Sequence, residues 1–314
     1  MPQTLITLLL GLAASTGLHA AGIGIGIGIG IGIGIGIGIG AVDDRGVRVE
    51  LPAPAQRIVA LAPSITELVF AAGGGAQLVG VPRFSDFPAA AKTITQIGDA
   101  SRIDLERVLS LKPDLVIGWK TGNHAADFER LEQLGFAVFV AEPGTLEAIP
   151  RLLRTLGMLA GSAAGAEQAA SDFERGIAAL NARYAARSRV KVFYEIWHQP
   201  LMTVNGKHMI SDVIGLCGGS NVFAAAPTLT PVIAIESVLA AQPEVVLGGS
   251  SATTPGEFAA PWVRNQAYAG LRQVRAMYVD PDYIQRQTPR ILQGAQAVCE
   301  HLEAVRAART VGIK

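Results

Sequence analysis

The feature that most constrains the fold is an internal repeat: two stretches of the first half of the chain return in the second half, in the same order. Residues 104–118 share with residues 234–248 a glutamate, a Val-Leu pair, a proline and a final glycine at matching positions. Residues 65–74 resemble residues 210–219 more weakly. Two copies at so long a period do not fit a solenoid, whose units span a few tens of residues. The repeat predicts two similar lobes enclosing a cleft. The alternative is a chance likeness between two helix-Pro-strand units.

Composition narrows the class of protein. The 314 residues are 50% hydrophobic, which is enough for the cores of two domains. The 26 Lys and Arg residues balance 26 Asp and Glu residues without a basic stripe, so we expect no nucleic-acid partner. The two cysteines, Cys217 and Cys299, form no C-x-x-C pair, which disfavours zinc and redox motifs.

The N-terminus has the pattern of an export signal. The apolar run at residues 5–12 is too short to span a bilayer, and Leu18-His19-Ala20 suits a signal peptidase. The residues before the run lack the usual lysine or arginine, and no cysteine follows it to carry a lipid anchor. We therefore expect residues 1–20 to be a signal peptide and the mature protein to be periplasmic. In that oxidising compartment the two cysteines become a candidate disulfide.

Residues 22–40 alternate strictly between glycine and isoleucine. All these glycines share one parity, so the phosphate-binding pattern G-x-G-x-x-G never occurs. The alternation suits a strand with one isoleucine face, but glycine at every second position weakens a strand. We interpret residues 21–40 as a low-complexity spacer without chemistry. An ordered tract would instead suit a structural or adhesive surface protein.

Short apolar strands alternate with helices along the rest of the chain, which predicts crossover units and parallel sheets. Residues 64–67 read as a capping box for the helix that follows. After a break at residues 162–165, residues 166–187 predict a helix of about 22 residues, about 33 Å long, which could tie two lobes together. A hairpin is expected at 42–51, strands at 57–61, 78–81, 115–118 and 137–140, and helices at 105–111 and 128–134; a second strand-helix series occupies 190–196, 209–216, 235–239, 245–247 and 276–279 and ends in a helix from 289 to about 308.

The predicted fold class is α/β, with an N-terminal lobe at residues 41–145, a helical linker at 146–187 and a C-terminal lobe at 188–314. Several groups of residues also resemble one family: Arg57-Ile-Val, Pro63-Ser, Thr66-Glu67-Leu, Ser85-Asp86-Phe-Pro88, Leu216-Cys-Gly-Gly-Ser-Asn221 and Thr288-Pro-Arg290. From about residue 57 to 302 the chain is similar to the periplasmic substrate-binding proteins that feed cobalamin, haem and ferric-siderophore importers, and most similar to their cobalamin-binding branch.

This resemblance implies a class III periplasmic binding protein fold, in which two Rossmann-like parallel-sheet lobes are joined by a single long bridging helix. It places the ligand in the cleft between the lobes. It also implies a Cys217–Cys299 disulfide within the second lobe, with two buried unpaired cysteines as the alternative.

Two glutamates, Glu106 and Glu236, occupy the same slot early in equivalent helices of the two lobes. The resemblance implies that such a pair docks on arginines of a two-fold symmetric permease dimer. The alternative is that each carboxylate only complements its helix dipole, an effect of some tenths of a kcal/mol.

The resemblance also implies a ligand pocket. Phe84 falls where the family's cobalamin binders carry a tyrosine, so a flat platform remains but a candidate phenolate ligand for haem iron is lost. Trp119, at the end of a strand, is a candidate cleft wall, with core packing as the alternative. Trp197, followed by His198, is expected to overhang the cleft.

A second group of pocket residues lies near the C-terminus. Asp282, Tyr283 and Arg286 fall on a ligand-contacting loop; the alternative for Asp282 and Arg286 is a surface ion pair worth under about 1 kcal/mol. Two further aromatic positions of the cobalamin pocket fall on Ala100 and Thr230. The cleft is therefore expected to be roomier, which leaves a different corrinoid or another large chelate open.

The sequence carries no pattern for catalysis. It contains no G-x-S-x-G elbow, H-E-x-x-H motif or Walker lysine, its histidines lack metal-ligand spacing, and Ser64 is interpreted as a helix cap. We expect a monomeric, non-enzymatic periplasmic solute-binding protein without cofactor or metal site. It is expected to capture cobalamin or a related corrinoid and deliver it to an inner-membrane ABC importer. The alternative is a haem or ferric-siderophore binding protein of the same fold.

Overall fold

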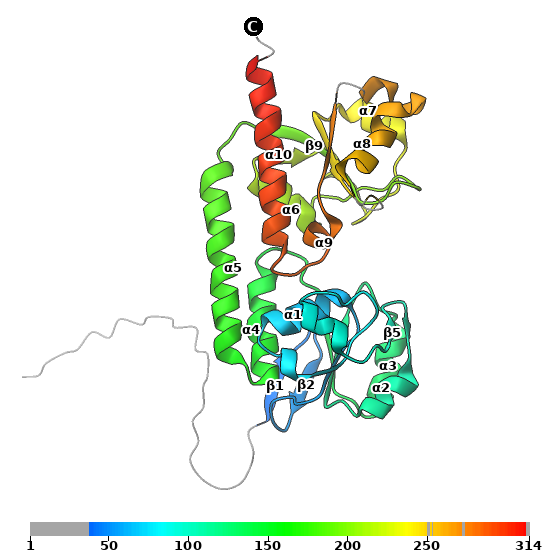
Figure 1. Cartoon of the computed structure of the whole chain (residues 1–314), viewed down its shortest axis with the longest axis vertical. Helices are drawn as coiled ribbons and strands as arrows, with labels where there is room; N and C mark the ends of the chain where they lie inside the picture. The colour runs from blue at the N-terminus through cyan, green and yellow to red at the C-terminus, as the bar shows by residue number, and fades with distance from the viewer. Residues whose placement is uncertain (1–37, 250–251, 253, 272–273, 312–314) are drawn as a thin grey trace, which may run out of the picture. The chain divides into compact units, whose positions relative to one another are not determined.

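The computed structural model describes residues 38–249, 252, 254–271 and 274–311 (Figure 1). The predicted signal peptide and most of the predicted spacer lie outside this range. Within it, no helix is both long and apolar enough to cross a membrane. The expected hairpin consists of β1 (Ile39–Val42) and β2 (Arg48–Leu51), paired antiparallel. The hairpin includes the last two residues of the predicted spacer, because Ile39 pairs with Leu51, whose side chain is buried.

The first lobe is built on a four-stranded parallel sheet in the order β4-β3-β7-β8. The strands are mostly buried, which explains why they read as continuous apolar runs. The elements of this lobe are β3 (Ile58–Ala60), α1 (Pro63–Ala71), a 3₁₀ turn at Gly75–Gln77, β4 (Leu78–Gly80), a 3₁₀ turn at Ala89–Thr93, β5 (Gly98–Asp99), β6 (Arg102–Ile103), α2 (Leu105–Leu111), β7 (Leu115–Trp119), α3 (Ala125–Gln133) and β8 (Val138–Ala141).

The second lobe is built on a parallel sheet in the order β10-β9-β11-β12. If the strands of each sheet are counted along the chain, both sheets have the order second, first, third, fourth. The elements of this lobe are β9 (Val190–Glu195), α6 (Met209–Leu216), β10 (Gly219–Asn221), α7 (Ile235–Ala241), β11 (Val245–Gly248), α8 (Pro255–Arg264), a 3₁₀ segment at Gln266–Leu271, β12 (Arg275–Tyr278), α9 (Pro281–Ile284) and α10 (Ile291–Val311).

The internal repeat corresponds to equivalent structural units. Helix α2 leads into β7 as α7 leads into β11, and each helix ends at a left-handed residue just before the shared proline: Lys112 with φ 46° and Gln242 with φ 51°. In the weaker repeat, α1 matches α6, and Gly73 and Gly218 share a positive φ of 81° and 71°. The likeness between the two halves is therefore not a chance resemblance.

Two helices connect the lobes, α4 (Ala148–Ala160) and the 22-residue α5 (Ala163–Tyr184). The break between them falls at Gly161, whose φ of 72° ends α4, so α5 begins three residues before its predicted start. Helix α5 packs against α1 and α4 of the first half and against α6 and α10 of the second (Figure 1). One buried apolar cluster also runs from Ile58 through Phe173 to Val298. These observations confirm the predicted fold class of two parallel-sheet lobes joined by a long helix.

Two local features of the second lobe anchor α6. Its N-terminus is capped by His208, whose Nδ1 accepts a hydrogen bond from the backbone N–H of Ile210 at 3.2 Å. Its C-terminus is tied to α10 by the Cys217–Cys299 disulfide, and both sulfur-bearing side chains are fully buried. Among the described residues, neither cysteine is free.

The predicted capping box is wrong. Helix α1 starts after Ala62, which has no side chain to cap it, and Pro63 occupies the first turn. Ser64 and Glu67 both lie inside the helix and are buried. The pattern failed because Pro63 already suits a helix start, where a missing N–H costs nothing. The carboxylate of Glu67 is bound instead by residues more than two hundred positions away.

Candidate functional site

The residues predicted to bind ligand follow the carboxyl ends of strands in both sheets. Phe84 comes shortly after β4, and Trp119 is the last residue of β7. Trp197 comes just after β9, and the segment from Asp282 to Arg286 follows β12. Because the strands of each sheet are parallel, their carboxyl ends share one edge, which is where open α/β sheets bind ligands. The predicted pocket residues therefore collect at the binding edge of each lobe.

Ion pairs bring these two edges together. Arg286 of the second lobe donates from Nη1 to Asp86 Oδ1 at 3.0 Å and to Glu67 Oε1 at 2.7 Å, both in the first lobe. Its Nη2 pairs with Asp282 Oδ1 at 2.9 Å within its own segment. The Asp282–Arg286 ion pair of the alternative is therefore present, but the Arg286 side chain is only 17% exposed and also bonds to the first lobe. We call Glu67, Asp86, Asp282, Arg286 and Arg290 the interlobe ion cluster.

The two carboxylates at the rim of this cluster differ in their electrostatics. Burial acts to raise the pKa of Asp86, but the hydrogen bond and charge of Arg286 outweigh it and leave that pKa below its ordinary value. Burial raises the pKa of Asp282, and the charges of Asp86 and Asp280 add to this effect against the opposing charge of Arg286. Both side chains keep close to half of their surface exposed, so they can accept hydrogen bonds from a ligand.

Exposed aromatic rings stand at the same strand ends. Phe84 is 69% exposed with φ 67°, and the guanidinium of Arg83 lies 5.6 Å from the centre of its ring. Trp197 is 47% exposed, and its Nε1 donates to the carbonyl of Gln199 at 2.8 Å. Large flat side chains left open to solvent beside polar groups are typical of a ligand-binding surface.

Two other predicted residues are more enclosed. Trp119 is half-buried, packs against the core and donates from Nε1 to Glu142 Oε1 at 3.3 Å. Gly122 makes room for its ring, since a Cβ there would lie 1.8 Å from Trp119 Cε3. Tyr283 is also half-buried and lies next to Arg290, whose guanidinium is 5.2 Å from its ring centre. Trp119 therefore has features of both the predicted cleft wall and its core-packing alternative.

A buried polar group supports the loop of Trp197. Glu195, the last residue of β9, accepts a hydrogen bond from Trp262 Nε1 at 2.8 Å and lies 3.3 Å from His198 Nδ1. Burial raises the pKa of Glu195, against the opposing charge of His198. A surface hollow of about 670 Å³ lies beside this loop, lined by His198 and Gln199 and by part of α8.

Residues 58–279 match the family model described as periplasmic binding protein. The chain belongs to this family. A vitamin B12-binding protein from Vibrio parahaemolyticus is 37% identical over 256 residues, which cover 82% of this chain and 92% of the relative. The periplasmic vitamin B12 binding protein BtuF of Vibrio cholerae is 34% identical, with a TM-score of 0.72 and coverage of 81% and 99%. These matches confirm the predicted family and the prediction of a binding protein rather than an enzyme.

A second solved structure that is similar to this chain is that of a heme-binding protein. The periplasmic heme-binding protein RhuT from Roseiflexus sp. RS-1 is 28% identical, with a TM-score of 0.66 and coverage of 81% of this chain and 99% of RhuT. Proteins similar to this chain thus include a vitamin B12 binding protein and a heme-binding protein.

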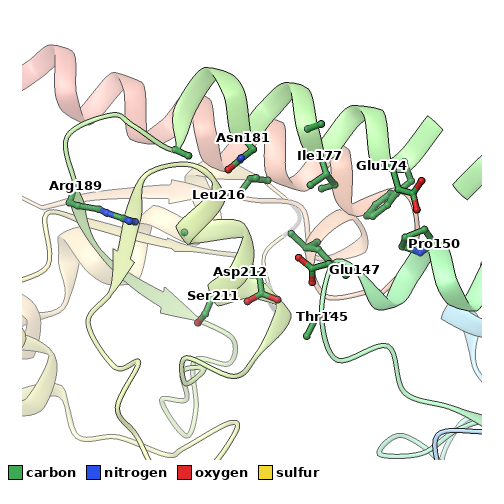
Figure 2. Close-up of a pocket in the computed structure, with 15 residues that line it drawn as sticks. Thr145, Glu147, Pro150, Glu174, Ile177, Asn181, Arg189, Ser211, Asp212 and Leu216 are labelled. Atoms are coloured by element: carbon green, nitrogen blue, oxygen red, sulfur yellow. The ribbon is translucent and has the colours of Figure 1, made fainter. Parts of the chain in front are cut away.

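A cavity of about 760 Å³ in this periplasmic binding protein lies away from the predicted pocket residues, among the start of α4, α5 and α6 (Figure 2). Figure 2 shows Glu147 and Asp212 facing the same space, with Ile177 of α5 on its wall. Burial raises the pKa of Asp212, and the charge of Glu147 adds to the effect. None of the predicted ligand residues lines this cavity. The strand-end edges remain the candidate site, because exposed aromatic rings and interlobe ion pairs lie there.

Three participants in the interlobe ion cluster were not predicted as site residues: Glu67, Asp86 and Arg290. All three belong to sequence motifs that resemble the family, but neither the spacing nor the periodicity of the sequence indicates that these side chains contact one another. Arg290 also stacks over Phe87, with its guanidinium 4.1 Å from the ring centre. Such contacts depend on how the lobes pack, and only the folded chain shows them.

Proposed function

We propose that this protein captures cobalamin or a related corrinoid between its two lobes and delivers it to an ATP-driven importer. The observation that carries this proposal is the 34–37% identity to vitamin B12-binding proteins over about four-fifths of the chain. Phe84, Trp119, Trp197, Asp282, Tyr283 and Arg286 are the proposed ligand-binding residues. Exposed rings suit the faces of a flat macrocycle, and exposed carboxylates suit amide donors around its edge.

Haem or a ferric siderophore remains the second candidate, supported by the likeness to RhuT. The phenyl ring of Phe84 offers no phenolate to coordinate iron, so among the proposed ligand-binding residues only Tyr283 could supply one. The rim carboxylates Asp86 and Asp282 also disfavour an anionic ligand, because like charges brought together in a partly buried site repel each other.

Calorimetric titration with cyanocobalamin, haemin and a ferric siderophore tests the ligand assignment. We expect cyanocobalamin to bind with a dissociation constant below about 1 μM. Replacement of the exposed ring in Phe84→Ala should weaken this binding. The matched control is Leu134→Ala, which removes an exposed apolar side chain just before the start of β8, away from the carboxyl-end edge. Tight haemin binding without any corrinoid binding would overturn the proposal in favour of the second candidate.

We also propose that Glu106 and Glu236 dock on the permease dimer. Both are exposed and occupy the first turn of their helices, α2 and α7. The equivalence of these helices supports two matching contacts to a symmetric partner. Glu106 lines a hollow of about 650 Å³ that is also lined by Arg83, Arg102 and Arg130.

Export, processing and domain organisation of the protein follow from the same reading of the sequence. We propose that residues 1–20 are removed on export, that residues 21–40 are mainly a spacer, and that the mature protein acts in the periplasm as a monomer. Residues 41–145 and 188–314 would be the ligand-binding lobes and 146–187 their linker. Capture would need little hinge motion, because α5 is continuous over 22 residues and packs against both halves.

A further inference from the structure

A buried carboxylate of the first lobe is held entirely by the second. Glu67 in α1 is 3% exposed. Its Oε1 accepts from Arg286 Nη1 at 2.7 Å and from Arg290 Nη2 at 2.6 Å. Its Oε2 accepts from Arg290 Nε at 2.9 Å and from Thr288 Oγ1 at 3.1 Å. All four bonds reach from residues 286–290 of the second lobe across to α1.

This arrangement differs from that of the other buried carboxylates in the described part of the chain, Asp43 and Glu195. Asp43 is bound by Arg45 and by backbone N–H groups of the first lobe. Glu195 is bound by Trp262 and His198 of the second. Each keeps its partners when the lobes move as rigid bodies, whereas Glu67 does not.

Separation of the lobes would therefore carry a specific electrostatic penalty. A buried carboxylate is tolerated only while it is paired and hydrogen-bonded, and loss of its partners leaves an uncompensated charge. The two arginines would lose a shared carboxylate at the same time. A bidentate arginine-carboxylate pair such as Arg290–Glu67 also restricts orientation, because both guanidinium nitrogens must stay in plane with the carboxylate.

The segment that Glu67 holds includes one proposed ligand residue, Arg286, and lies just after two others, Asp282 and Tyr283. Arg286 bonds to Asp282 on one side and to Asp86 on the other, and Asp86 is two residues from Phe84. A shift of residues 286–290 relative to α1 would thus change the spacing between Asp282 and Phe84.

We propose that Glu67 is a positioning residue for the ligand cleft. As the buried carboxylate at the centre of the interlobe ion cluster, it fixes the distance between the binding edges of the two lobes. The effect of Glu67 on ligand binding rests on the proposed function. Its effect on lobe spacing does not depend on the ligand and concerns the ligand-free protein.

The experiment measures lobe spacing in the ligand-free protein. Spin labels at Ser110→Cys and Ala240→Cys occupy exposed, equivalent positions of α2 and α7, and the native cysteines are already paired. The test variant is Glu67→Gln, which keeps the size of the side chain but removes its charge. Thr288→Val is a milder second variant that removes one bond to Glu67. The matched control is Glu244→Gln, which breaks a glutamate-arginine pair within the second lobe, that with Arg309.

We expect Glu67→Gln to broaden or shift the inter-lobe distance distribution, Thr288→Val to do so less, and Glu244→Gln to leave it unchanged. Cyanocobalamin should dissociate from Glu67→Gln on the order of tenfold faster than from the wild type. A distance distribution identical to that of the wild type in both cluster variants would overturn the inference, even if their melting temperatures fall, since Glu67 would then only stabilise the fold.

A changed distance distribution with unchanged cyanocobalamin dissociation would also overturn the positioning role and leave only a link between lobes. If Glu67→Gln fails to fold, the comparison of Thr288→Val with Glu244→Gln decides. Failure of the wild type to bind any corrinoid would remove the proposed function, and the distance measurement on the ligand-free protein would still decide whether Glu67 sets the lobe spacing.

Discussion

The cap of helix α6 makes the protein sensitive to mild acid. His208 accepts the Ile210 N–H through Nδ1, so this nitrogen must be unprotonated in the folded state. Burial lowers the pKa of His208 from 6.5 to about 4. The unfolded chain therefore binds a proton on this side chain below pH 6.5, whereas the folded protein resists protonation until about pH 4.

The magnitude follows from this pKa difference of about 2.5 pH units. At 1.36 kcal/mol per pH unit, burial of the neutral His208 lowers the free energy of unfolding by about 3 kcal/mol near pH 4, relative to a histidine with equal pKa values in both states. The unfolded state binds more protons in this window, so stability rises with pH. This loss of stability is absent above about pH 6.5 and grows as the pH falls from about 6.5 towards about 4.

Urea denaturation at pH 7 and at about pH 4.5 measures the effect. His208→Asn keeps a favoured capping side chain but cannot titrate. Between these pH values the wild type should lose roughly 2 kcal/mol more unfolding free energy than the variant, while acid effects elsewhere in the chain are common to both. Equal losses in the two proteins would refute the role of His208 as a buried neutral cap.

Two further predictions concern stability and transport. Replacement of both cysteines, Cys217→Ser with Cys299→Ser, should lower the free energy of unfolding by about 4 kcal/mol, since the disulfide closes a separation of 82 residues; a loss under about 1 kcal/mol in urea denaturation would contradict this. Glu106→Ala with Glu236→Ala should leave corrinoid affinity within about twofold but sharply reduce uptake by the assembled importer. Each single variant should have a similar effect on uptake, and normal uptake by the double variant would leave both glutamates with only their helix-dipole role.

Local signals in the sequence were sufficient for the elements that repeat. The helix at Leu105–Leu111 and the helix at Met209–Leu216 have the predicted bounds, because proline, glycine and apolar spacing mark where such segments start and stop. The 22-residue length of the linker helix was also predicted, although its start was shifted by three residues. From such elements the two parallel-sheet lobes followed, since strands alternating with helices leave few other topologies.

The pairing of distant charged groups was decided only by tertiary structure. Ser64 to Glu67 carries a local capping pattern, yet the carboxylate of Glu67 is bound by Arg286 and Arg290, more than two hundred residues away. The sequence shows which side chains are charged, but the partner of each depends on the approach of two separately folded sheets. The sequence alone was thus sufficient to predict two similar lobes with aromatic and acidic residues after their strands. Which of these side chains contact each other depends on how the lobes pack, because the buried carboxylate of Glu67 in one lobe is paired by arginines of the other.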